Sequence, residues 1–175
     1  MQAADWLVQL GVAAAALVTT IAAALVHYKG MLALGEHFDR LGNVGAGQPL
    51  RQRTVLKVVA ALFVLHVAEI ALFGFVYWGL LRLKGTGGID GTELLGPLDA
   101  LYFSAVSFTT VGFGGLKPIG AIRFVAGAEA LIGFMLITWS ASFMFLHMQR
   151  HWKSDDSAAE DEKRGDDQQA GRRDG

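Results

Sequence analysis

The sequence predicts an all-α membrane protein with three membrane-spanning helices and a short re-entrant helix between the second and the third. Hydrophobic residues make up 53% of the 175 residues and charged residues only 18%, which is less charge than a soluble domain carries. Segments long and apolar enough to cross a hydrocarbon core of ~30 Å occur three times. A fourth apolar segment is too short to span and leads directly into a glycine-rich stretch.

Aromatic residues lie near the ends of the three long segments, as expected for side chains at the membrane interface. The first segment runs from about Trp6 to Tyr28, the second from Val58 to Leu83 and the third from Phe124 to Met148. The first apolar run is longer than that of a signal peptide, and no Lys or Arg precedes it. We therefore expect all three segments to be retained as spans.

The basic residues predict the orientation of the chain. They are concentrated between the first two spans and after the third, and the positive-inside rule places such loops in the cytoplasm. The N-terminus and the loop between the second and third spans are then outside, and the protein is a multi-pass protein of the cell membrane. The residues that decide this are Lys29, Arg40, Arg51, Arg53, Lys57, Arg150 and Lys153.

Composition narrows the function classes. The chain has no cysteine, so neither disulfides nor thiolate metal sites are possible, and a formal net charge of -1 gives no case for nucleic-acid binding. The sequence has no nucleophile–base pair and no phosphate-binding loop, so we do not expect an enzyme. No span carries regularly spaced arginines, so we do not expect a voltage sensor. Residues 149–175, polar and rich in charge, are predicted to form a disordered cytoplasmic tail.

The loop between the second and third spans contains the most informative pattern. Pro97 begins an apolar segment that ends at Phe108, and eleven or so helical residues measure only ~16 Å. The glycine-rich residues 109–115 follow at once. Irregular backbone at membrane depth is tolerated only where it is buried in protein or lines a water-filled path. Ion conduction explains it, because backbone carbonyls can replace the hydration shell of a cation, and glycines at positive φ let successive carbonyls face one axis.

Residues 101–114 resemble the pore helix and selectivity filter of the potassium channel pore-domain family, whose filter usually reads T-V-G-Y-G. Bacterial ion-channel proteins with one P-loop and an extra N-terminal span are the most similar group. The resemblance implies a tetrameric pore in which the second span is the outer helix and the third the inner helix. It implies that the ion-binding residues of the filter are Thr110, Val111, Gly112, Phe113 and Gly114.

The resemblance also divides the chain into regions. An N-terminal transmembrane helix (1–28) and a cytoplasmic loop (29–57) precede a pore domain (58–148). Within this domain the expected parts are the outer helix 58–83, turret 84–96, pore helix 97–108, filter 109–115 and inner helix 123–148.

Some positions depart from the family pattern or have an implied role. Phe113 replaces the usual tyrosine, which removes a hydroxyl that can brace the filter. Gly115 and Val106 stand where some members carry a pair of carboxyl groups, so that pair is absent as a unit. Gly133 falls where the family often has a gating hinge.

Ionisable residues inside spans are rare and usually face protein or water. Glu129 is a candidate support for the filter through hydrogen bonds to the pore helix, with ion attraction as the alternative. His66 and Glu69 share a helix face, and we expect a structural contact between helices rather than a gating role. His147 and His151 have the spacing of a metal or proton site, but two histidines without a third ligand favour ordinary interfacial residues. Trp139, Ser140 and Ser142 are interpreted as helix packing.

The resulting hypothesis is a homotetrameric, potassium-selective channel subunit, with the lipid bilayer and K⁺ as its partners. No cofactor and no metal are expected beyond the permeating K⁺. One alternative is a weakly selective monovalent cation channel, because the support behind the filter is reduced. A second alternative is a non-conducting membrane adaptor that retains a pore-like fold.

Overall fold

Three long helices dominate the computed structural model of the chain. They are α1 (Gln2–Gly42), α2 (Gln52–Leu80) and a C-terminal helix over residues 123–146. Each contains a stretch long and apolar enough to cross a membrane, which confirms the prediction of an all-α membrane protein with three spans. The described residues are 2–42, 52–91, 96–112, 115–146 and 149.

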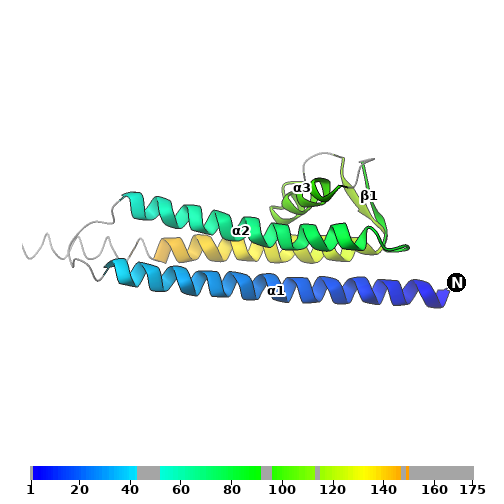
Figure 1. Ribbon diagram of the computed structural model, residues 1–175, viewed down its shortest axis with the longest axis horizontal. Helices are drawn as coiled ribbons and strands as arrows, with labels where there is room; N and C mark the ends of the chain where they lie inside the picture. Colours follow the sequence, from blue (N-terminus) through cyan, green and yellow to red (C-terminus); the bar gives the residue numbers. More distant parts are fainter. Residues whose placement is uncertain (1, 43–51, 92–95, 113–114, 147–148, 150–175) are drawn as a thin grey trace, which may run out of the picture.

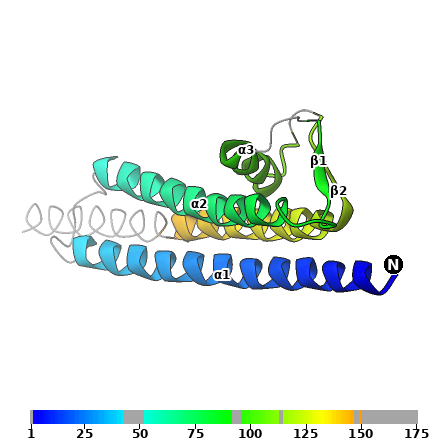
Figure 2. The same ribbon diagram turned by 45° about the vertical axis from the view of Figure 1, so that its right-hand side comes forward.

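The three long helices lie side by side along most of their length (Figures 1 and 2). The shorter helix α3 (Pro97–Phe108) lies against α2, over the half of the bundle that is nearer the N-terminus. The strands β1 (Gly88–Asp90) and β2 (Lys117–Ile119) pair antiparallel at this same end, and the 3-10 turn η1 (Gly120–Ile122) leads into the C-terminal helix. Helix α3 and the β1–β2 pair are thus on the same half of the bundle as the N-terminus.

One side of α1 packs against the rest of the chain. Its buried residues recur every three or four positions, the spacing of a single face of an α-helix. Most of the other side chains on α1 are exposed apolar groups, as expected for a helix whose outer surface meets lipid. The buried face consists of Val12, Ala16, Thr19, Ala23, His27 and Met31.

The predicted cytoplasmic loop over residues 29–57 is largely helical instead. Helix α1 continues to Gly42 and α2 already begins at Gln52. Met31 in this extension packs in a cluster with Val58 and Leu62 of α2. Hydropathy measures how much of a helix can lie in hydrocarbon, and it does not mark where the helix itself ends. Contacts between α1 and α2 therefore stabilise helix beyond the apolar segment.

The turret contains β1, which pairs with β2 beyond the predicted filter, and the sequence did not predict this pair. Gly87 and Gly120 lie next to each other at φ values of 118° and 75°, in the region that favours glycine. A Cβ on Gly120 would lie only 2.7 Å from the Cα of Gly87. The two backbones can approach this closely because neither residue has a side chain, and the paired strands close the loop that carries α3.

Helix α3 is held at its N-terminus and by two close helix contacts. Pro97 is in its first turn, and the Gly96 N–H donates to the Asp99 carboxylate at 2.8 Å. A Cβ on Gly74 of α2 would lie 3.1 Å from the Cα of Leu101, so α2 and α3 cross almost backbone to backbone.

The C-terminal end of α3 makes an even closer contact with the C-terminal helix. A Cβ on Gly133 would lie 2.9 Å from the Phe108 carbonyl carbon and closer still to its oxygen. Phe108 is fully buried. Gly133 is therefore required for close packing of α3, whether or not it also serves as a hinge.

We predict that Gly133→Ala destabilises the assembled protein by about 1–3 kcal/mol, because the added methyl group displaces the end of α3. Thermal unfolding of the purified protein in detergent measures the change. Gly127→Ala is the matched control, since it lies on the same helix with open space around the position of a Cβ. Normal stability of Gly133→Ala together with altered gating would show that the glycine acts as a hinge alone.

Candidate ion-conduction site

The chain enters the helix bundle along α3 and returns to the same end. Phe108, the last residue of α3, contacts Gly133, which lies at the middle of the apolar span Gly120–Leu146. By residues 117–119 the chain is back at the turret, paired with β1. The described residues 109–112 therefore follow α3 from a point at the middle of the bundle.

The backbone after α3 adopts an irregular conformation with two left-handed residues. Thr110 has a φ of 57° and Gly112 a φ of 66°, with Val111 between them. A β-branched residue at positive φ is uncommon, and such strain gathers at functional positions. Residues 109–112 are all exposed in the single chain. The last two predicted filter residues, Phe113 and Gly114, lie outside the described residues.

Glu129, which we predicted to support the filter, connects the C-terminal helix to α2 and α3. Its carboxyl group is fully buried and accepts a hydrogen bond from the Tyr77 hydroxyl at 2.6 Å. The Ser104 hydroxyl of α3 lies 2.5 Å from its other oxygen. Tyr77 belongs to α2 and also packs edge-on against the Phe103 ring of α3, with ring centroids 5.0 Å apart. The predicted hydrogen bond from Glu129 to the pore helix is present.

The Ser104 hydroxyl has two possible acceptors but only one hydrogen to donate. The Ser104 hydroxyl lies 2.7 Å from the Ile70 carbonyl oxygen as well as 2.5 Å from Glu129. A hydroxyl has one hydrogen, so it can donate to only one of these acceptors at a time. If Ser104 donates to Ile70, the contact with Glu129 needs a hydrogen from the carboxyl side. A side chain at position 129 that can both accept a hydrogen bond from Tyr77 and donate one to Ser104 therefore fits this network.

Within the described residues, the two positions that carry carboxyl groups in some family members have none here. Val106 is half-buried on α3, at the position where some family members have a carboxyl group. Gly115 contacts the turret through its backbone: a Cβ on Gly91 would lie 2.6 Å from the Gly115 carbonyl oxygen. The polar bracing of α3 thus comes from Tyr77 and Glu129.

A second buried polar group joins α1 to the pore region. His66 and Glu69 contact each other within α2, with 2.9 Å between Nδ1 and a carboxylate oxygen. The expected contact between helices is made by the second carboxylate oxygen of Glu69, which lies 2.8 Å from Nδ1 of His27 on α1. His27 was not among the predicted site residues. Its place on the buried face of α1, eight residues after Thr19, is the signal that could have identified it.

Of the remaining predicted residues, the structure describes Ser140 and Ser142. Ser140 is buried, and its hydroxyl lies 3.2 Å from Nε2 of His66, so it contributes a hydrogen bond as well as packing. Ser142 donates to the Thr138 carbonyl within its own helix. His147 and His151 lie outside the described residues.

The fold and this site define a membrane-embedded ion channel subunit, with two spans around a short helix and an irregular glycine-containing segment. A profile of the ion channel family matches residues 56–150, which is more than half of the chain. The chain therefore belongs to this family of two-span ion channels, that of the potassium channel pore domain. Its first span lies outside the matched region.

Two curated relatives share a shorter stretch with this chain. Protein LctB of Bacillus caldotenax is 45% identical over 38 residues, and Protein LctB of Geobacillus stearothermophilus is 42% identical over the same length. The match covers 22% of this chain and 28% of the length of each relative. No solved structure matches the chain.

We predict that Glu129→Gln is tolerated and that Glu129→Ala is not. The Gln amide accepts from Tyr77 and donates to Ser104, whereas Ala removes the acceptor of the buried Tyr77 hydroxyl, leaves a cavity and costs about 2–4 kcal/mol. Thermal unfolding of the two purified variants measures the difference. A Gln variant as unstable as the Ala variant would show that position 129 requires the carboxylate charge.

Proposed function

We propose that the protein is one subunit of a homotetrameric, potassium-selective channel. The observation that supports this best is the backbone that follows α3 at the middle of the bundle, where Thr110 and Gly112 have positive φ and residues 109–112 are exposed. Residues of alternating φ can direct successive carbonyls to one side, as a dehydrated cation requires. One chain supplies one such segment, so several chains must surround an axis.

The electrostatics of α3 favour a cation. Its carbonyl end lies beside Gly133 at the middle of the span, and a helix C-terminus carries partial negative charge. A cation in a cavity near this end would be stabilised before it enters the filter.

The orientation we propose places the N-terminus and the filter segment on the outer side. Helix α3 and the β1–β2 pair lie over the half of the bundle that is nearer the N-terminus (Figures 1 and 2), and the helical basic residues Lys29, Arg40 and Lys57 lie toward the opposite end. The segment from the second to the third span then acts as a re-entrant loop that is open to the outer solution.

A weakly selective cation channel is the second candidate. Val106 offers no polar group behind the filter, and Gly115 offers no carboxylate. With less support, the carbonyl ring could adapt to ions of different size, because selectivity depends on how its oxygens are held.

Reconstitution into liposomes tests the function. With opposed K⁺ and Na⁺ gradients, we expect a reversal potential close to the K⁺ equilibrium potential. A reversal potential that follows both ions equally would instead establish the weakly selective channel. If the assembled protein shows no flux of either ion, the protein is instead a non-conducting membrane adaptor.

We further predict that Gly112→Ala lowers K⁺ flux by about tenfold or more. A Cβ at a φ of 66° costs about 1–2 kcal/mol, which reduces the population of the conducting conformation by about that factor. Nothing lies within 4 Å of this Cβ in the chain, so assembly should be retained. Gly79→Ala, which also has open space but lies in a helix, is the control. Unchanged flux in Gly112→Ala would refute the role of Gly112 in the filter.

A further inference from the structure

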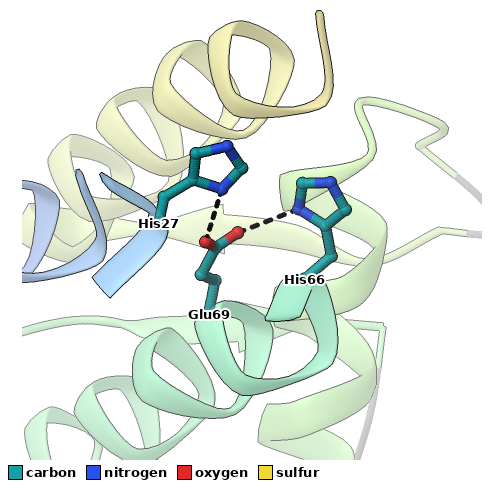
Figure 3. A group of neighbouring side chains, drawn as sticks. All are labelled: His27, His66 and Glu69. Carbon is teal, nitrogen blue, oxygen red and sulfur yellow. Dashed lines mark hydrogen bonds and ion pairs between the residues drawn. The ribbon is translucent and has the colours of Figure 1, made fainter. Parts of the chain in front are cut away.

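Three potential metal ligands meet between α1 and α2. His27 extends from α1, and His66 and Glu69 extend from α2, so that both imidazoles face the same carboxylate (Figure 3). The Nδ1 atoms of His27 and His66 lie 2.8 and 2.9 Å from the two oxygens of Glu69. His27 and Glu69 are fully buried, and the His66 side chain is 18% exposed.

Neither partner of Glu69 carries a permanent positive charge. Both are imidazoles, which are neutral in the form that binds metals. A carboxylate inside an apolar bundle is costly unless a positive charge compensates it. A divalent cation between the three side chains would supply that charge.

The second nitrogen of each imidazole is compatible with metal binding through Nδ1. For His66, Nε2 lies 3.2 Å from the Ser140 hydroxyl, which can either donate a hydrogen bond to that nitrogen or accept one from it. For His27, Nε2 is buried and has no hydrogen-bond partner, the single such side-chain atom within the described residues. In the absence of a metal, the Glu69 carboxylate accepts a hydrogen bond from Nδ1–H of His27. Metal binding would replace this hydrogen bond, and the unpartnered Nε2 can take the proton so that Nδ1 becomes a ligand.

The spacing of the ligand atoms fits a transition metal. All three lie within 4.8 Å of one another. Ligands placed about 2.0–2.2 Å from a tetrahedral Zn²⁺ are roughly 3.3 Å apart, so small side-chain rotations suffice. Two imidazoles and one carboxylate are a common zinc donor set that leaves a fourth position open, whereas Ca²⁺ and Mg²⁺ prefer oxygen ligands only.

We propose that His27, His66 and Glu69 form a binding site for a divalent transition-metal ion, Zn²⁺ in particular, that fastens the first span to the pore domain. The site adjoins the end of α3, because the His66 and Phe108 rings lie 5.8 Å apart. It also touches the C-terminal helix, since the His27 and Trp139 rings are 5.3 Å apart. A bound ion would join α1 to the helices that position the filter.

Metal analysis of the full-length protein tests this proposal. The protein is produced in medium with added Zn²⁺, purified in detergent, dialysed against a fixed free Zn²⁺ concentration and analysed for metal per chain. We expect one Zn²⁺ per chain, and a content at least tenfold lower in His27→Gln, His66→Gln and Glu69→Gln. His37→Gln is the matched control, because His37 is an exposed histidine on the same helix as His27. Substitution of both His147 and His151 by Gln should also leave the content unchanged.

A second measurement does not depend on the variants. Replacement of Zn²⁺ by Co²⁺ in the wild-type protein should give the strong visible absorption of a tetrahedral ion with nitrogen and oxygen ligands. Because the spectrum is recorded on the wild-type protein, it tests for the metal site even if a substitution prevents assembly. A wild-type protein without stoichiometric Zn²⁺ and without this absorption would overturn the proposal. So would a metal content that survives in the three ligand variants and disappears when His147 and His151 are replaced.

Discussion

The contact between Gly133 and the Phe108 carbonyl group positions the rest of the pore region. A side chain on Gly133 would prevent α3 from reaching the middle of the bundle, and the backbone after Phe108 would then begin nearer the surface. In hydrocarbon, irregular backbone is stable only where protein or water satisfies its polar groups. The depth at which α3 ends therefore decides whether residues 109–112 can serve as a conduction path.

Two buried carboxyl groups connect the helices around this contact. Glu129 joins the C-terminal helix to α2 and α3 through Tyr77 and Ser104. Glu69 joins α2 to α1 through His27. Apolar helices in a bilayer gain little from further burial, so hydrogen bonds and close packing at small residues determine how they associate. The extra first span is thus attached by a polar contact beside the end of α3 as well as by its packed face.

Much of the fold follows from patterns that depend on neighbouring residues alone. Apolar length predicts the three spans, and Pro97 followed by an apolar segment predicts a short helix before the glycines. The contact between His66 and Glu69 follows from their spacing on one helix. The helical extension of α1 to Gly42 was missed because contacts with α2 stabilise it, and hydropathy does not report such contacts. The β1–β2 pair was missed because it joins residues on either side of α3.

The sequence by itself determined the class of protein, because spans, the short helix and the glycine pattern are local properties that a family profile also detects. Only the tertiary structure decided which polar residues meet. His27 and Glu69 are 42 positions apart, and Tyr77 and Glu129 are 52 apart. Side chains so distant along the chain come together through the relative rotation and depth of packed helices. Those depend on close contacts such as that at Gly133, which no local pattern encodes.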